Sequence, residues 1–370
     1  MSAAKTNILD LPCGALESHL ESLGEKPYRA RQVMKWIYHR DITDFHAMSD
    51  LTKGLRTMLD ETCEVRLPRV AEERHASDGT RKWIVELDDA SKVETVLIPD
   101  RGRNTLCVSS QVGCTLDCSF CATGKQGFKR NLTTAEIIGQ VWIAAQALKR
   151  DGDTRGVTNI VLMGMGEPLL NFDNVVAATH LMMDDLAFGI SKRRVTVSTA
   201  GVVPAIYELA KVSDVSLAVS LHAPNDALRD QLVPINRRYP IAELLDACRH
   251  YQRGMGEHRV VTFEYTLIRD VNDSIEQARR LAVLLRGNPC KVNLIAFNPF
   301  RGTTYTRPDA DRVRAFQTQL VNAGLVAMLR VTRGDEIDAA CGQLVGEFED
   351  RTRRRSRYIA RQRAENARVA

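Results

Sequence analysis

The stretch CTLDCSFC, residues 114–121, contains three cysteines within eight positions. No second Cys-x-x-Cys pair occurs in the chain, although it has nine cysteines among its 370 residues. A structural zinc site is closed by four ligands, usually in two short-spaced pairs, so these three thiols do not fit one. The stretch therefore predicts a metal site in which one ligand position is left for another molecule.

The sequence around this stretch alternates between strand-like and helical patterns. The strand-like runs are NTLCVSS (104–110), VTNIVLMG (157–164), RRVTVSTAG (193–201), VSLAVSLHA (215–223), VTFEYTLI (261–268) and VNLIAFNP (292–299). Helical stretches lie between them, such as 133–149 and 241–252. Alternation in units of about 30 residues implies parallel strands with helical crossovers. Six units are fewer than the eight of a closed barrel, so we predict an α/β fold with an open, partial (β/α)6 barrel, and AMLRVTRG (327–334) as a further strand near its edge.

The remaining segments suggest how the chain divides. Apolar residues at helical spacing predict an N-terminal helical accessory domain at 1–65. Two alternating runs joined by a polar turn predict a short β-extension or linker at 66–100. The partial barrel is then expected at 101–345, followed by a basic tail at 346–370.

Composition indicates the class of protein and the compartment in which it is expected. With 44% hydrophobic and 26% charged residues, the sequence is that of an ordinary globular protein. Its apolar runs are too short for a membrane span and its N-terminus lacks a signal-peptide pattern, so we expect a cytoplasmic protein with no membrane partner. A reducing compartment would keep most cysteines as thiols or metal ligands. The net charge of +5 permits a nucleic-acid partner without requiring one.

Polar and sulfur groups recur just after the strand-like runs. In barrels of this kind, loops at the C-terminal ends of the strands form the active site, so these groups are expected at one rim. They are Cys114, Cys118, Cys121, Gly164, Gly166, Glu167, Ser198, Ser220, His222, Asn298 and Cys341.

The cysteine spacing resembles that of the radical S-adenosylmethionine (SAM) enzymes. Three thiolates can hold three irons of a [4Fe–4S] cluster and leave the fourth iron open. In the radical SAM enzymes the methionine end of SAM chelates that iron, and electron transfer to the sulfonium releases a 5′-deoxyadenosyl radical. The resemblance implies Cys114, Cys118 and Cys121 as cluster ligands. A zinc site or three unrelated cysteines would require the spacing, the position and the strand–helix rhythm to agree by accident.

The same resemblance assigns contacts to SAM. MGMGEP (163–168) is similar to the glycine-rich stretch along the SAM amino group, which implies Gly166 and Glu167 as contacts, with Glu167 accepting from the ammonium. The competing interpretation is a dinucleotide fingerprint, but its third glycine is absent and Pro168 stands where a helix would begin.

Further SAM contacts are expected at the ends of later strands. The resemblance implies contacts to the SAM ribose and carboxylate from Ser198, Ser220, Leu221 and His222. It implies a contact to the adenine or ribose from Asn298 and a contact to the adenine from Phe120. Taken singly, each has a plainer interpretation as a strand-end polar group, a core aromatic residue or, for Asn-Pro, an ordinary turn.

Motifs along nearly the whole chain narrow the resemblance further. They are LGEKPYRARQVMKWIY (23–38), VETVLIP (93–99), SSQVGCTLDCSFCATGKQG (109–127), MGMGEPLLN (163–171), VSTAG (197–201), VSLHAPND (219–226) and RGDEIDAACGQL (333–344). Together they closely resemble the family of dual-specificity ribosomal-RNA and transfer-RNA adenine-C2 methyltransferases.

This resemblance implies roles for two further cysteines and a glutamate, which alone would be interpreted as buried thiols and a strand residue. It implies that a first SAM would methylate Cys341 and that a second would yield the radical that takes hydrogen from the S-methyl group, so that two SAM are used per turnover. The methylene radical would add to adenine C2, and Glu94 is the expected base for the C2 proton. Cys107 would then attack the Cys341 sulfur, which would release methylated RNA and leave a Cys107–Cys341 disulfide.

The implied partners are 23S rRNA, at its peptidyl-transferase centre, and tRNA, at the adenosine 3′ of the anticodon. An electron donor such as flavodoxin and a thiol reductant are also implied, and the enzyme is expected to be a monomer with an RNA-binding N-terminal domain. Candidate phosphate contacts are Lys125, Lys129, Arg130, Arg193, Arg194 and the arginine run at 349–363, for which a solvated helix face is the alternative. Two other functions remain open: a sister enzyme that methylates adenine C8, and a non-catalytic Fe–S protein that binds RNA.

Overall fold

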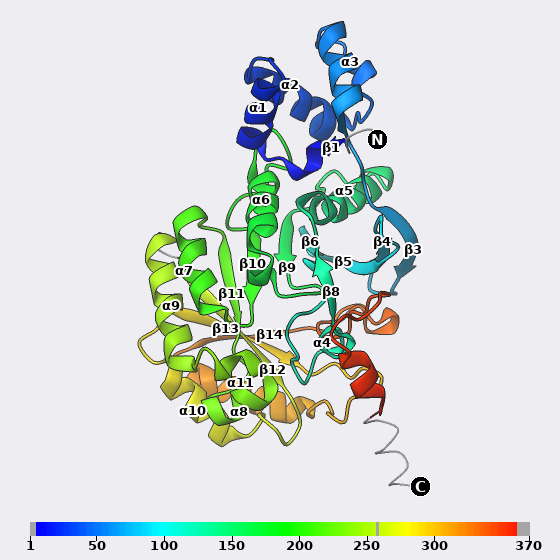
Figure 1. Cartoon of the computed structure of the whole chain (residues 1–370). Helices are drawn as coiled ribbons and strands as arrows, with labels where there is room; N and C mark the ends of the chain where they lie inside the picture. Colours follow the sequence, from blue (N-terminus) through cyan, green and yellow to red (C-terminus); the bar gives the residue numbers. More distant parts are fainter. Residues whose placement is uncertain (1–4, 257–258, 361–370) are drawn as a thin grey trace.

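The computed structural model describes residues 5–256 and 259–360, and its centre is one ten-stranded sheet (Figure 1). From one edge to the other, the strands are β14 (Val326–Arg330), β13 (Cys290–Ala296), β12 (Val261–Leu267), β11 (Ser216–Ser220), β10 (Val195–Thr199), β9 (Asn159–Leu162), β6 (Arg103–Cys107), β5 (Lys92–Asp100), β4 (Arg81–Glu86) and β3 (Arg69–His75).

The strands from β6 to β14 pair in parallel, and their order in the sheet follows their order in the chain. All six predicted strand-like runs are present, and the predicted further strand forms the end of the sheet as β14. The predicted partial barrel is therefore confirmed. Strands β3, β4 and β5 add an antiparallel portion that continues the same sheet through β5 and β6.

Helices connect the parallel strands and lie along the outer side of the curved sheet (Figure 1). They are α4 (Ala122–Gln126), α5 (Thr134–Arg150), α6 (Phe172–Met183), α7 (Val203–Val212), α8 (Asp226–Leu232), α9 (Ile241–Gly254), α10 (Ile275–Leu285) and α11 (Ala310–Asn322). Most of their buried residues join those of the strands in one large core, and a smaller cluster that includes Leu232 of α8 lies apart from it. Within the described residues, no helix has both the length and the apolar character needed to cross a membrane.

The N-terminal segment folds into three helices at one end of the molecule, as its periodicity predicts (Figure 1). They are α1 (Cys13–Ser22), α2 (Tyr28–Met34) and α3 (Lys53–Thr62). Thr52 caps α3 by accepting from the Leu55 N–H, which satisfies one donor that the first turn leaves unpaired. A short parallel pair, β1 (Thr6–Asn7) with β2 (Cys63–Glu64), ties the start of this segment to its end.

One feature of the cluster region was not predicted from the sequence. A small antiparallel pair, β7 (Gln111–Gly113) with β8 (Phe128–Asn131), brackets the cysteine stretch. Its close approach requires glycine at 113, because a Cβ there would lie 2.2 Å from the Gly127 carbonyl oxygen. The ends of the cysteine stretch are thereby held side by side, and the Cys114 N–H donates to the same Gly127 oxygen at 2.7 Å.

Candidate active site

The three cysteines of the opening motif lie between β7 and α4, beyond the C-terminal end of β6. Burial raises the pKa of the Cys118 thiol well above its ordinary value, and the nearby Cys114 and Cys121 raise it further. Burial also raises the pKa of Cys114. Ionised thiolates in such a setting need a bound cation, so this donor set fits an iron–sulfur group.

A [4Fe–4S] cluster places different demands on its ligands than a single metal ion does. Within residues 5–256 and 259–360, no three His, Cys, Asp or Glu side chains gather in the way that one metal ion requires. A [4Fe–4S] cluster makes no such demand, because each thiolate binds a different iron.

Cys107 and Cys341, far apart in the sequence, line the same cavity of about 480 Å³. Cys107 is the last residue of β6 and is buried, whereas Cys341 is half-buried in the loop beyond β14. All nine cysteines lie within the described residues and are free thiols. Asn298, Met163 and Arg330 line the cavity with them.

The cavity has a cation next to its thiols. Burial raises the pKa of Cys107 to about 12, the charge of Cys341 adds to this rise, and Arg330 opposes it. The pKa of Arg330 is itself raised, chiefly by Cys341. The guanidinium of Arg330 therefore favours a thiolate at Cys107. Arg330 was not predicted as a site residue, because an arginine in a strand at the sheet edge gives no signal in the sequence.

Asn298 connects the end of β13 to Cys341. Its Nδ2 donates to the Cys341 carbonyl at 3.1 Å, and its Oδ1 accepts from Arg307 at 3.0 Å and from Thr332 at 3.3 Å. Asn298 is therefore placed to hold the Cys341 main chain. Its expected contact with SAM stays a prediction.

Glu94 lies in β5 and is buried beside the loop that carries Cys341. Its Oε1 is 3.0 Å from Lys82 Nζ, and its Oε2 accepts from the Val345 N–H at 2.9 Å. Lys82 also donates to the Asp338 carbonyl at 3.1 Å. Burial raises the pKa of Glu94, while Lys82 and the Val345 N–H oppose this rise. Among the described residues, those lining the cavity do not include Glu94, so its expected role as base stays a prediction.

The MGMGEP segment follows β9 and packs on β7. Gly166 has φ of +104°, and a Cβ there would lie 2.6 Å from the Gln111 side chain, so only glycine fits. Glu167 accepts from the Leu169 N–H at 3.1 Å and from the Ala200 N–H at 2.7 Å. Burial raises the pKa of Glu167 to about 7. Glu167 thus joins the end of β9 to the end of β10 and places a carboxyl group at the expected SAM rim.

Ser198, Ser220, Leu221 and His222 lie at the ends of the adjacent strands β10 and β11. His222 has φ of +56°, and its Nδ1 accepts from the Thr266 N–H at 2.9 Å. Burial lowers the pKa of His222 to about 3, so the ring is neutral with its proton on Nε2. The Phe120 and His222 ring centroids are 4.5 Å apart, which brings residues 114–124, here called the cluster loop, against this rim.

Arg229, on α8, joins the same two strand ends and was missed by sequence reasoning. It is fully buried and donates to the carbonyls of Ala200 at 2.6 Å, Ser220 at 3.0 Å and Leu221 at 3.1 Å. A single arginine in NDALRDQL has the pattern of a solvated helix residue. Only its burial identifies it as a support for the rim.

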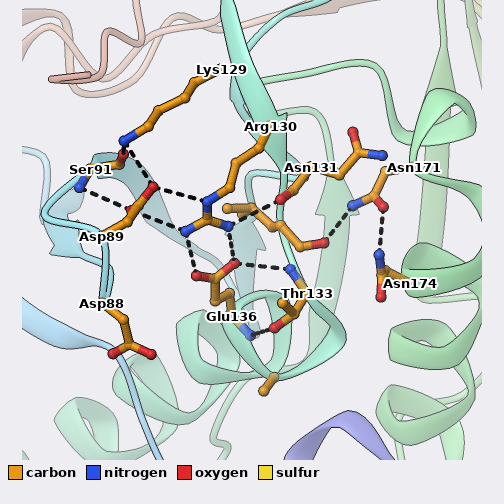
Figure 2. Close-up of polar contacts among 12 residues, drawn as sticks. Asp88, Asp89, Ser91, Lys129, Arg130, Asn131, Thr133, Glu136, Asn171 and Asn174 are labelled. Atoms are coloured by element: carbon orange, nitrogen blue, oxygen red, sulfur yellow. Dashed lines mark hydrogen bonds and ion pairs between the residues drawn. The ribbon is translucent and has the colours of Figure 1, made fainter. Parts of the chain in front are cut away.

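The predicted phosphate contacts near the cluster are engaged with acidic side chains instead. Arg130 binds Asp89 and Glu136 through paired hydrogen bonds, and Lys129 lies 2.8 Å from Asp89 (Figure 2). Lys125 is 2.8 Å from Asp117. These three cations link protein segments, and their expected role in binding phosphate stays a prediction. Arg193 and Arg194 are exposed, and residues 361–370 of the basic tail lie outside the described residues.

Two family models match the chain. Residues 6–65 match the ribosomal RNA large subunit methyltransferase N-terminal domain, and residues 108–282 match the radical SAM superfamily. Both matches agree with the fold described above.

Proteins with close sequence similarity cover almost the whole chain. The dual-specificity RNA methyltransferase RlmN of Marinobacter nauticus is 59% identical over 360 residues, 97% of this chain and 98% of that protein. The protein of the same name from Pseudomonas fluorescens is 59% identical over 97% of this chain and 94% of its own length. A crystal structure of a radical SAM methyltransferase from Sphaerobacter thermophilus has a TM-score of 0.85 and 45% identity, and covers 92% of this chain and 99% of that one. The chain therefore belongs to the family of dual-specificity RNA methyltransferases within the radical SAM superfamily.

Proposed function

We propose that this enzyme methylates C2 of adenosine in 23S rRNA and in tRNA, through an S-methylcysteine at Cys341. The observation that carries the proposal is that Cys107 and Cys341 line one cavity, close enough to influence each other's charge. Adenine C2 is an electron-poor carbon without a lone pair, so it cannot readily accept a methyl cation from SAM. A carbon radical held on a protein sulfur can add to it.

Cys114, Cys118 and Cys121 would hold the [4Fe–4S] cluster, which supplies the electron that cleaves SAM to a radical. Glu167, at the end of β9, would accept from the SAM ammonium once it is ionised, and the neutral His222 would offer its Nε2–H at the same rim. Glu167 and His222 are each held by main-chain N–H groups, so little reorganisation would be needed to receive SAM.

Cys341 would be methylated by one SAM and would lose a hydrogen atom from its methyl group to the radical formed from a second. The methylene carbon on Cys341 would then bond to adenine C2. Loss of the C2 proton, with return of one electron to the oxidised iron–sulfur cluster, would restore the ring. Glu94, beside the Cys341 loop, is the proposed acceptor of that proton.

Cys107 would complete the reaction. Its thiolate attacks the Cys341 sulfur, an S–S bond forms, and the bond from that sulfur to the methylene carbon breaks. The carbon takes a proton and becomes the methyl group. Arg330 would favour the Cys107 thiolate against the burial that opposes it. A thiol reductant would then restore both cysteines.

The adenine must leave its stack to enter the cavity, which favours an RNA loop over a duplex. The peptidyl-transferase centre and the adenosine 3′ of the anticodon are the proposed targets, and the N-terminal helices are proposed to contact the RNA. We further propose action as a monomer in the cytoplasm, with a donor such as flavodoxin providing electrons.

The test is anaerobic reconstitution with iron and sulfide, followed by incubation with SAM, a reductant and either 23S rRNA or tRNA. The expected products are 5′-deoxyadenosine and 2-methyladenosine, identified by mass spectrometry of digested RNA against 2-methyl and 8-methyl standards. An 8-methyl product would instead identify the sister activity. A protein that binds RNA but forms no 5′-deoxyadenosine would be a non-catalytic binder.

A further inference from the structure

The chain beyond Cys341 does not leave the active site, but runs along the cysteine motif. We call residues 342–358 the C-terminal clasp; in Figure 1 this segment lies near α4. The Gly342 carbonyl accepts from the Ala122 N–H at 2.8 Å, and the Leu344 carbonyl accepts from Thr123 Oγ1 at 2.7 Å. The clasp therefore follows α4, which begins directly after Cys121.

Asp350 fixes the clasp against the end of α4. Its carboxylate accepts from the N–H groups of Thr352 at 2.7 Å, Arg355 at 3.0 Å and Phe128 at 3.3 Å. A Cβ at Gly127 would lie 2.0 Å from Asp350 Oδ1, so the clasp packs directly on the main chain there. The chain after Asp350 is thereby turned back toward the cysteines.

Arg354 is the side chain that this turn delivers to the cluster loop. Its Nη atoms donate to four main-chain carbonyls, those of Cys114 at 2.8 Å, Thr115 at 2.9 Å, Leu116 at 2.7 Å and Gly124 at 3.3 Å. Its Nε donates to Thr352 Oγ1 at 3.1 Å. These bonds engage all five N–H donors of the guanidinium, so none is left for an RNA phosphate.

The four carbonyls lie at the two ends of the cysteine motif. Three are consecutive and begin at the first cysteine, and the fourth follows the last cysteine by three residues. Gly124 also packs tightly here, because a Cβ at that position would lie 3.2 Å from the Leu116 carbonyl oxygen. One guanidinium thus joins the two ends of the loop and places a permanent positive charge beside it.

We propose that Arg354 is a positioning residue for the iron–sulfur cluster, which closes the cluster loop from the C-terminal clasp and makes the cluster easier to reduce. This rests on the proposed ligands Cys114, Cys118 and Cys121. The loop must present its thiolates at fixed spacing, and the guanidinium restrains both of its ends. Its charge favours the reduced cluster, which carries one more negative charge. The clasp begins directly after Cys341, so this segment connects the methyl-carrying cysteine to the cluster loop.

The test compares Arg354→Gln and Arg354→Lys with the wild type and with Arg355→Gln, a matched control at an exposed neighbour. Each protein is reconstituted anaerobically, its iron is counted, its reduction potential is measured by electron paramagnetic resonance, and iron release to a chelator is timed. These readouts do not depend on RNA methylation. Circular dichroism verifies that each variant is folded.

Arg354→Gln should shift the potential to a more negative value and release iron about tenfold faster, since charge-assisted hydrogen bonds are lost. Arg354→Lys should restore the potential, because the charge remains, but should release iron faster than the wild type, because an ammonium cannot bridge four carbonyls. Arg355→Gln should match the wild type.

Three results would overturn the proposal. If Arg354→Gln and Arg355→Gln have the same reduction potential and the same rate of iron release, the clasp does not act on the cluster. The ligand assignment would remain intact. A wild type that takes up no cluster would refute the ligand assignment and the proposal together. If Arg354→Gln does not fold, the test rests on Arg354→Lys. Iron release from Arg354→Lys at the wild-type rate would contradict the proposal.

Discussion

Lys82 and Glu94 form an ion pair of 3.0 Å in which the two side chains are only 1% and 3% exposed. The pair lies on neighbouring strands, and both partners reach the loop of Cys341, through the Asp338 carbonyl and the Val345 N–H. A buried charge of this kind is stable only with its partner present. The pair therefore anchors the Cys341 loop to the antiparallel part of the sheet.

Removal of the cation should be more harmful than removal of both charges. Lys82→Met leaves Glu94 buried without a counter-charge, which should cost about 3–5 kcal/mol in the free energy of unfolding. The double variant Lys82→Met, Glu94→Gln should recover most of this loss, since no buried charge remains. Urea unfolding of the cluster-free proteins measures the free energy of unfolding of the single and the double variant. If the single and double variants are equally stable, the stability lost in Lys82→Met does not come from the unpaired charge of Glu94.

The parallel strands of the main sheet were predictable because short runs rich in apolar and β-branched residues alternate with helical stretches, and the cluster ligands because their spacing is local. The Lys82–Glu94 pair was not predictable. Lys82 looks like an ordinary polar residue in the alternating run KWIVELDD, and its environment is set by a loop more than 250 positions away. The same reason applies to Arg354, whose arginine-rich sequence indicates a solvated or RNA-binding tail. Contacts that cross the whole chain leave no periodic signal.

The raised pKa of Glu167 predicts a dependence of stability on pH. Its folded-state pKa of about 7 exceeds the ordinary 4.5, so the folded protein binds this proton more tightly than the unfolded chain. The stabilisation is complete below about pH 4.5 and is lost as the pH rises through about 7. Relative to Glu167→Gln, the cluster-free wild type should lose roughly 2 to 3 kcal/mol of unfolding free energy between about pH 5 and pH 8. If the free energies of unfolding of the wild type and of Glu167→Gln change with pH in parallel, this prediction is wrong.

Arg229 should be required for SAM binding but not for the cluster. Arg229→Lys cannot reach the three carbonyls that Arg229 joins at the ends of β10 and β11, so both ends should move. Equilibrium dialysis of the reconstituted variant should show SAM affinity at least about tenfold weaker, with unchanged iron content. Arg237→Lys, at an exposed position nearby, is the control. Normal SAM binding by Arg229→Lys would refute the supporting role.

The cluster should depend on each of its three proposed ligands. Cys114→Ala, Cys118→Ala and Cys121→Ala each remove one of only three thiolates, so each variant should retain no stable cluster after anaerobic reconstitution. Iron and sulfide analysis measures this, with Cys248→Ala as a control thiol on α9. A full cluster in all three single variants would show that the iron is held elsewhere.

The relay between Cys341 and Cys107 is tested most directly by the variant that stops it halfway. In Cys107→Ala, methylation of Cys341 and addition to adenine C2 need no thiol at position 107, whereas release of the RNA does. A neighbouring thiolate acts at an effective concentration that reaches on the order of 10⁵ M in well-oriented cases, so added reductant should rescue release poorly. After incubation with SAM, reductant and RNA, Cys107→Ala should carry RNA through denaturing gel electrophoresis, and Cys107→Ala, Cys341→Ala should not. Cys107→Ala that runs free of RNA, under conditions in which the wild type methylates it, would contradict the account.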